Sequence, residues 1–449
     1  MKTKTVENQI LSGVIWKQLL LFFFPLLFGS FFQQLYNTAD AIVVGRFVGK
    51  EALASVGGGA GTLINLFVGF FVGLSAGVTV TISQYFGRKA LKEVSQAIHT
   101  AVAFAIAAGS LLMLTGLILA PDILKWMNTP EAILNSSTTY VRICFCGMIS
   151  NLIYNIGAGI LRALGDSKRP LYFLIVSCAA NIILDILFVV VFGLGVAGAA
   201  IATILAQTMS AVLVCITLVK LDALYFLTLR GIRFHGWVMK KIVQIGLPAG
   251  IQSLMYSFSN ILIQTNVNDF GTDTVAAWTA YGKIDSVFWM IISALGISIT
   301  TFTGQNYGAG YYCRVRKGVR QSLIISVLIT AGISVILIPS GEILLKLFTS
   351  DTQVIQIGTM MIRFLVPTYF TYIGIEIFSG ALRGMGDAFI PMIMTCSGIC
   401  LLRVIWLIFA VPKWHMITTV ITCYPLTWSV TSVCFILYYR YYVKTRKIA

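Results

Sequence analysis

Two acidic residues interrupt strongly apolar stretches in the first half of this 449-residue chain. Asp40 ends the polar run Gln33-Gln34-Leu35-Tyr36-Asn37-Thr38-Ala39-Asp40, and Asp185 follows Asn181 by four positions. Residues four apart lie on one face of a helix, so Asn181 aligns with Asp185, as Tyr36 does with Asp40. An Asp near the centre of a membrane helix costs about 2.5–3.5 kcal/mol on insertion scales. Acids in such positions therefore predict a functional site.

Cation binding is the chemistry that these side chains offer. Burial and mutual repulsion favour proton uptake by an Asp40–Asp185 pair, which could then carry a proton near neutral pH. The same oxygens, with the Asn181 carbonyl and the hydroxyl of Thr203, could instead bind Na⁺. An inward-moving charge gains about 2.3 kcal/mol per 100 mV, which can drive another solute outward. The structural alternative is that each acid caps or hydrogen-bonds a neighbouring helix.

The second half has its own charged residues in apolar stretches. They are Lys283, Asp285, Glu376 and Arg403. Two positive and two negative side chains can cancel, so a substrate site and a structural ion-pair network are both open. Arg142, the other buried charge of the first half, recurs as Arg363, which indicates a role in the scaffold. Asp40 and Asp185 thus lack an evident fixed counter-ion.

The elements that must position these residues are membrane helices. The chain is 58% hydrophobic and 11% charged, whereas charged residues make up about 25% of soluble domains. Apolar stretches long enough to cross a membrane recur throughout. We expect twelve, near residues 15–43, 53–83, 94–119, 134–160, 170–192, 195–219, 246–267, 275–304, 319–339, 354–381, 391–410 and 416–439.

An internal duplication organises these segments. Leu161-Arg162-Ala163-Leu164-Gly165-Asp166 returns as Leu382-Arg383-Gly384-Met385-Gly386-Asp387, 221 positions later. We therefore predict an N-terminal six-helix lobe at 1–219, a linker at 220–245 and a C-terminal six-helix lobe at 246–449. Each copy has six helices, an even number, so both copies enter the membrane from the same side. They are then related by a pseudo-two-fold axis along the membrane normal. The fold class is an all-α integral membrane protein of twelve helices in two bundles.

The two copies differ where the first-half acids lie. The counterparts of Asn181 and Asp185 are Leu402 and Trp406, and the segment that matches helix 1 ends in Ile263 rather than an acid. A duplicated scaffold keeps in both copies what folding requires. The differences therefore point to function at Asp40, Asn181 and Asp185. We assign the repeated loop itself to holding adjacent helices together.

The net charge of +16 follows the membrane topology. We number each loop after the predicted segment that it follows. The termini and the even-numbered loops hold 23 Lys and Arg residues, including Lys2, Lys4 and Lys447, whereas the odd-numbered loops hold 5. By the positive-inside rule both termini are cytoplasmic. The basic charge then needs no nucleic-acid partner, and we expect a monomer in the lipid bilayer of a bacterial plasma (inner) membrane. The first helix is expected to be retained, and nine scattered Cys residues do not indicate a disulfide framework.

Several motifs resemble those of the multidrug and toxic compound extrusion (MATE) family, in its bacterial DinF-like branch. They are Pro25 followed by Asn37-Thr38-Ala39-Asp40, Gly-Gln-Asn-Tyr-Gly at 304–308, the two Leu-Arg-x-x-Gly-Asp loops, and Asn181-Ile-Ile-Leu-Asp185 followed by Gly193 to Thr203. The likeness covers nearly the whole chain. It implies two helical bundles, alternating access, and efflux of cationic or amphipathic small molecules in exchange for H⁺ or Na⁺, with no other cofactor.

The resemblance also implies roles for individual residues. Asp40, Asn181, Asp185 and Thr203 match the cation site of that branch. Polar residues at Gln33, Tyr36, Asn37 and Asn155 would line the first-lobe cavity. The related NorM-type branch has a helix 7 Glu where this chain has Tyr256, and a helix 10 Asp at Tyr372, one turn before Glu376. This departure puts a cation site in the second lobe in doubt.

A secondary active efflux transporter, and not an enzyme, is the function we expect. An intramembrane enzyme would need a catalytic cluster, but the three histidines lie in different regions. The alternative within the same superfamily is a lipid-linked oligosaccharide flippase. Such a flippase would need cationic residues to hold a pyrophosphate, and only Lys283 and Arg403 support this alternative. A major facilitator antiporter is less compatible, because Gly87-Arg88-Lys89 lacks the preceding Asp-Arg of that family's loop motif.

Overall fold

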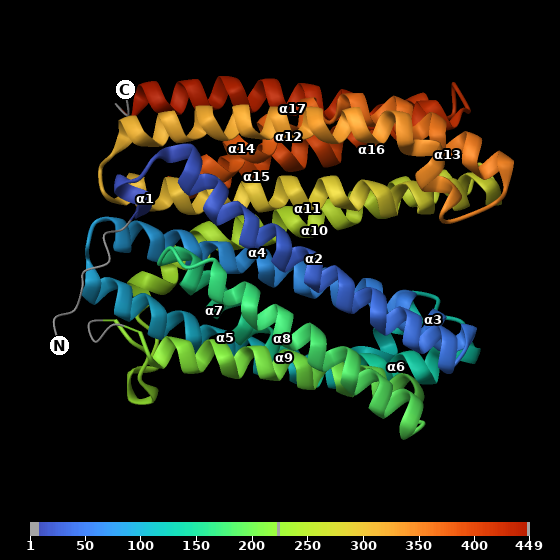
Figure 1. Cartoon of the computed structure of the whole chain (residues 1–449), viewed down its shortest axis with the longest axis horizontal. Helices are drawn as coiled ribbons and strands as arrows, with labels where there is room; N and C mark the ends of the chain where they lie inside the picture. The colour runs from blue at the N-terminus through green and yellow to red at the C-terminus, as the bar shows by residue number, and fades with distance from the viewer. Residues whose placement is uncertain (1–8, 222–224, 447–449) are drawn as a thin grey trace. The chain divides into compact units, whose positions relative to one another are not determined.

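The computed structural model describes residues 9–221 and 225–446, which form helices joined by short connections (Figure 1). Lys2, Lys4 and Lys447, used above to predict the orientation, lie outside the described residues. The helices up to the middle of the chain are α1 (Gln9–Ser12), α2 (Ile15–Phe47), α3 (Lys50–Gly57), α4 (Gly59–Gly87), α5 (Leu91–Trp126), α6 (Glu131–Cys146), α7 (Met148–Ala163), α8 (Lys168–Asp185), η1 (Ile186–Val191), α9 (Gly195–Val219) and η2 (Leu229–Gly231). The remainder are α10 (Gly236–Asn268), α11 (Thr272–Gly308), α12 (Tyr312–Lys346), α13 (Thr352–Leu365), η3 (Val366–Thr368), α14 (Phe370–Gly384), α15 (Phe389–Thr395), η4 (Cys396–Leu401), α16 (Leu402–Ala410) and α17 (Ile417–Thr445).

The described helices account for the twelve predicted membrane spans. Nine continuous spans are long and apolar enough to cross a membrane, and two more are bent pairs, α6 with α7 and the α13–η3 helix with α14, at 48° and 50°. The remaining long helix among the described residues is α10, which falls short of this apolar criterion and whose first turns carry Lys240 and Lys241. The prediction of an all-α membrane protein with twelve spans is confirmed. The helices extend several residues past the predicted apolar segments, most of all α10, which begins at Gly236 rather than near 246.

The chain forms two compact units, and the division falls inside two long helices. One unit comprises Phe24–Gly250 and the other Met1–Phe23 with Ile251–Ala449. The part of α2 before Phe24 therefore belongs to the unit that contains Ile251–Ala449. The part of α10 up to Gly250 belongs to the unit Phe24–Gly250. Pro25 lies inside α2 and Pro248 inside α10, close to the two points of division. A proline within a helix removes one backbone hydrogen bond and favours a kink there.

Small residues let the first part of α10 pack closely on α4 within Phe24–Gly250. A Cβ on Gly77 would lie 2.2 Å from the carbonyl oxygen of Ile242, and a Cβ on Gly246 would lie 2.4 Å from that of Leu74. Gly73 and Gly250 meet in the same seam. Both helices thus carry two glycines four residues apart, which is the spacing that brings membrane helices into backbone contact. Val238 and Ile242 are fully buried in the core beside this seam.

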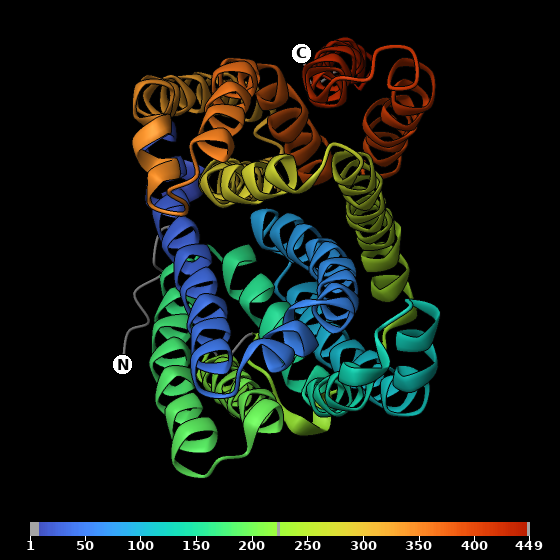
Figure 2. The ribbon, with the colours of Figure 1, turned by 90° about the vertical axis from the view of Figure 1, so that its right-hand side faces the viewer.

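The first part of α2 makes the matching contact in the other unit. Ser298 of α11 donates a hydrogen bond of 3.1 Å to the backbone carbonyl of Leu19. The carbonyl of Ile10, in the preceding helix α1, accepts from Asn306 at 3.4 Å and from Arg314 at 3.1 Å in the same unit. The core of this unit also includes α16 and α17, which lie side by side in Figure 2.

The repeated loop forms the same turn in both copies. Gly165 and Gly386 have φ angles of 95° and 98°, a region that residues with a side chain rarely adopt. The Asp166 carboxylate then accepts from the backbone N–H groups of Lys168 and Arg169, both at 3.1 Å. Asp387 instead accepts from the Tyr438 hydroxyl at 2.5 Å. Asp166 thus holds its own turn and Asp387 ties the second turn to α17, which agrees with the role in holding helices together assigned from the sequence.

Candidate functional site

Four polar side chains from three helices meet inside the Phe24–Gly250 unit. Asp40 comes from α2, Asn181 and Asp185 from α8, and Thr203 from α9. The exposed fractions of Asp40, Asn181 and Asp185 are 8%, 1% and 0%, so both acids are shielded from the surroundings. The structure thus brings together the four residues that the sequence placed at matching depth.

Asp185 lies at the point where its helix changes geometry. It is the last α-helical residue of α8, and the π-helical segment η1 begins at Ile186. A π-helical turn widens the backbone and often occurs at functional sites. The corresponding π-helical segment in the other unit, η4, does not follow an acidic residue.

Thr203 connects α9 to the acid on α2. Its hydroxyl lies 3.1 Å from Asp40 Oδ2 and 3.0 Å from the backbone carbonyl of Ala199. A hydroxyl has one proton to donate, so Thr203 can serve only one of these acceptors at a time. The Asp40 carboxyl also interacts with the side chains of Asp185 and Asn181.

These contacts leave several buried atoms without a hydrogen bond of normal geometry. Within the described residues they are Asp40 Oδ1, both carboxyl oxygens of Asp185, and both polar atoms of the Asn181 amide. No described Lys or Arg forms an ion pair with either acid. Buried polar groups in folded proteins are normally paired. Oxygens gathered in this way fit a bound cation, either a proton shared by the carboxyls or a metal ion such as Na⁺ that takes oxygen ligands.

The predicted cavity residues of this lobe separate into two groups. Tyr36 adjoins the site, where its hydroxyl interacts with the side chains of Gln33 and Gln207. Asn155 instead donates to the Asn151 carbonyl on its own helix at 2.9 Å. Asn37 is exposed. Gln207 was missed in the sequence, although its position one turn after Thr203 could have indicated it.

The two acids among the charged residues of the second half are held by neutral partners. Asp285 accepts a hydrogen bond from the Trp289 indole at 2.6 Å and another from the Tyr369 hydroxyl. Glu376 accepts from Tyr372 at 3.4 Å. The predicted alternative of an ion-pair network among these four residues is wrong, because phenols and an indole satisfy the acids.

The two basic residues of that set are also unpaired with acids. Arg403 is 2% exposed, donates to Ser259 at 3.0 Å, and lies 4.5 Å from the centre of the Tyr424 ring. Lys283 is exposed. The aromatic partners were missed in the sequence, yet Trp289 follows Asp285 by one helical turn and could have been found.

A family model described as MatE matches residues 25–187 and 248–408, one segment in each half of the chain. The chain belongs to the MatE family. The matched segments contain Asp40, Asn181 and Asp185, whereas Thr203 lies beyond them.

Curated proteins of similar sequence align over most of this chain. "Probable multidrug resistance protein YoeA" of Bacillus subtilis (strain 168) is 27% identical over 392 residues, covering 86% of this chain and 84% of that protein. "Probable multidrug resistance protein NorM" of Thermotoga maritima is 29% identical, covering 84% and 82%. A "FAD transporter" of Shewanella oneidensis is 25% identical, covering 78% of each chain. These relatives are thus named for multidrug resistance or, in one case, for transport of FAD.

Solved structures agree on the fold. A multidrug resistance MATE family transporter of the MOP superfamily, in an outward-facing conformation, superposes with a TM-score of 0.91 at 22% identity and covers the whole of both chains. A MOP superfamily transporter from Pyrococcus furiosus, described as having a binding pocket of reversed polarity, gives the same TM-score and identity. These similarities establish a multi-pass membrane protein with the architecture of MATE transporters.

Proposed function

We propose that this protein is a secondary active efflux transporter that exchanges inward H⁺ or Na⁺ for outward movement of a cationic or amphipathic small molecule. The observation that carries the proposal is the buried cluster of Asp40, Asp185, Asn181 and Thr203. Membership of a family whose curated members are named multidrug resistance proteins supports the substrate class. The family names give no support to an enzyme.

The uncompensated charge of the cluster is the physical reason for ion coupling. Removing a carboxylate from water without a partner costs several kcal/mol, and two adjacent carboxylates repel each other. No described basic side chain forms an ion pair with Asp40 or Asp185. A mobile cation would supply the missing charge and leave when the site opens to the other side of the membrane.

Thr203 can follow the charge of Asp40. When Asp40 is ionised, the hydroxyl gains most by donating to the carboxylate, because hydrogen bonds to charged groups are the stronger ones. When a proton neutralises Asp40, the same hydroxyl can donate to the Ala199 carbonyl at 3.0 Å. A change in the protonation of Asp40 on α2 would thus change the hydrogen bonding of Thr203 on α9, and the Thr203 hydroxyl would keep an acceptor in both states.

The setting of the proposed transporter follows from its charge pattern. We place it in a bacterial plasma membrane with both termini in the cytoplasm, as a monomer whose partners are the lipid bilayer and its small-molecule substrates. Flipping of a lipid-linked oligosaccharide would require free cations to hold a pyrophosphate. Arg403 already contacts Ser259 and Tyr424, so only Lys283 is left for that role.

The decisive test uses purified protein in liposomes and ethidium as the transported probe. Asp40→Asn and Asp185→Asn preserve side-chain shape and remove the charge. We expect both variants to lose efflux driven by an ion gradient, whereas Lys283→Gln keeps it. If both Asp variants export ethidium as fast as the parent, the proposed ion site is wrong.

The same assay identifies the ion. Efflux is measured with a proton gradient alone and with a Na⁺ gradient at constant pH. A requirement for Na⁺ at constant pH assigns Na⁺ to the cluster, and efflux driven by the proton gradient alone assigns H⁺. Turnover of any substrate without movement across the membrane would contradict a transporter.

A further inference from the structure

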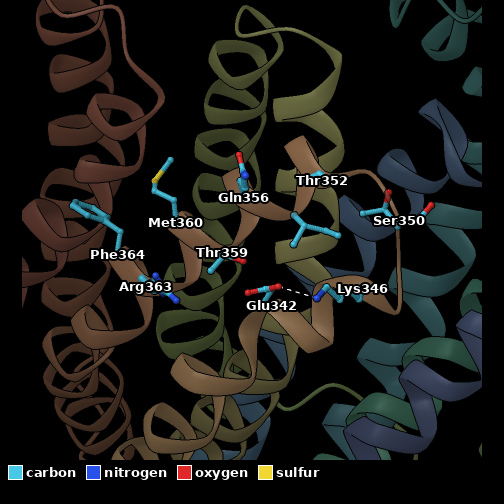
Figure 3. A pocket seen from close by; sticks show the side chains of 11 residues that line it. Glu342, Lys346, Ser350, Thr352, Gln356, Thr359, Met360, Arg363 and Phe364 are labelled. Carbon is cyan, nitrogen blue, oxygen red and sulfur yellow. Dashed lines mark ion pairs between the residues drawn. The ribbon is translucent and has the colours of Figure 1, made fainter.

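A cavity of about 940 Å³ lies between α12 and α13. We call it the α12–α13 pocket (Figure 3). Its lining residues are Glu342, Lys346, Thr349, Ser350, Thr352, Ile355, Gln356, Thr359, Met360, Arg363 and Phe364. The helices pack closely beside it, because Gly341 meets Ile362 and Gly358 meets Leu345.

One acid in the pocket faces two bases. Lys346 forms an ion pair with Glu342 at 2.8 Å, and both side chains are more than half exposed. Arg363 interacts electrostatically with the same carboxylate but forms no hydrogen bond or ion pair among the described residues. Figure 3 shows the three charged groups gathered at one level of the pocket. The site therefore keeps one net positive charge and an unused guanidinium.

The duplicated copy shows that this arrangement is particular to the second half. Lys125 and Arg142 stand where Lys346 and Arg363 stand, but Pro121 takes the position of Glu342. Arg142 donates from Nε to the Leu117 carbonyl at 3.1 Å, so its guanidinium is engaged by the backbone. Arg363 makes no such bond, which leaves it available to a ligand.

The surroundings of the pocket indicate an amphiphilic ligand. Hydroxyl and amide side chains line it together with the apolar side chains of Ile355, Met360 and Phe364. The hydroxyl of Thr359 in this lining is buried and has no hydrogen-bond partner within the described residues. Next to the pocket, α12 exposes large apolar side chains, among them Ile343 at 66%, and Leu347 directly after it is 77% exposed. These side chains face lipid in a membrane protein.

We propose that the α12–α13 pocket binds the phosphodiester headgroup of a membrane phospholipid. Arg363 can form a forked pair with two phosphate oxygens, a geometry that guanidinium matches better than ammonium does. Lys346 adds a second donor once it leaves Glu342, an exchange made easy because exposed ion pairs are weak. The acyl chains then lie along the apolar face of α12.

The test measures lipid retention by the detergent-purified full chain in native mass spectrometry. Phosphatidylglycerol is compared with diglucosyl diacylglycerol of the same acyl chains, which has no phosphate. We expect the parent to retain one phosphatidylglycerol about tenfold more tightly than the glycolipid. Lys346→Gln with Arg363→Gln should abolish this preference, and Glu342→Gln should strengthen it by freeing Lys346.

The matched control replaces the other copy, Lys125→Gln with Arg142→Gln, and should leave the preference unchanged. Equal retention of both lipids by the parent, or an equal loss in test and control variants, would overturn the proposal. Displacement of the lipid by millimolar inorganic phosphate would assign the site to soluble phosphate instead. The opposite direction expected for Glu342→Gln separates a binding effect from misfolding.

Discussion

The Thr203 hydroxyl is the smallest group on which the proposed ion site depends. It is the one described side chain that gives Asp40 a hydrogen bond of normal geometry, at 3.1 Å. Asp40 Oδ1, both carboxyl oxygens of Asp185 and both polar atoms of the Asn181 amide have no hydrogen bond of normal geometry within the described residues. Loss of this hydroxyl would leave the carboxylate with only its interactions with the side chains of Asp185 and Asn181.

Thr203→Val keeps the shape of the side chain and removes the hydroxyl. Hydrogen bonds to charged groups contribute about 1.5–3 kcal/mol, so we expect gradient-driven ethidium efflux to fall about tenfold or more. Thr203→Ser, which retains the hydroxyl, should stay close to the parent. Equal activity of the Val and Ser variants would show that the hydroxyl has no part in coupling.

Sequence spacing predicted the acid cluster but not the partners of the second-half charges. Asn181 and Asp185 share a helix face at a spacing of four, and this pattern survives folding. Tyr369, in the turn between η3 and α14, reaches Asp285 from 84 positions away along the chain, a distance over which helical periodicity carries no information. Counting charges suggested ion pairs, whereas aromatic hydroxyl and indole groups satisfied the acids.

At the scale of helices, the close contact of α4 with α10 is held by glycine. The backbone atoms of the two helices meet at Gly77 and Gly246, where no side chain fits. The sequence predicted where the apolar segments lie, since hydropathy follows from composition. It did not predict that α10 begins at Gly236, because Lys240 and Lys241 lower its apolar character, although the glycine spacing in both helices was readable.

Gly77→Ala would force these helices apart. Its Cβ would lie 2.2 Å from a backbone oxygen that cannot rotate away, and overpacking typically destabilises by about 1–3 kcal/mol. We expect a lower melting temperature for the purified variant. Gly332→Ala in α12 is the matched control, because nothing lies within 4 Å of its Cβ, and its stability should be unchanged or slightly higher. Equal melting temperatures for both variants would contradict the tight seam.

At the scale of the whole molecule, the compact units do not coincide with the two halves of the sequence. The unit containing the acid cluster is completed by 236–250, and the other is completed by the start of the chain up to Phe23. Because duplication leaves matching residues, the sequence alone divided the chain into two copies. Which part of each first helix packs in which unit depends on contacts between distant segments, and no pattern within one copy reveals it.

If the chain is divided at 222–224, we therefore expect that neither fragment folds when it is produced alone. Fragment 1–222 lacks the α10 segment with Val238 and Ile242, both fully buried, and fragment 223–449 lacks the segment that bonds Ser298 and Arg314. We expect each fragment alone to aggregate, and the two co-expressed fragments to co-purify through a tag on either one. A stable, monodisperse single fragment would contradict this expectation.

The reciprocal placement of the first parts of α2 and α10 also bears on how such a chain could arise. Consider an ancestor of six helices in which two copies associated. Each copy would have packed the first part of its first helix into the other copy. Exchange of an identical element is a low-energy route to a symmetric dimer. Gene fusion would then have tethered two partners that already completed each other, and the later loss or gain of acids in one copy would have made the two halves unequal.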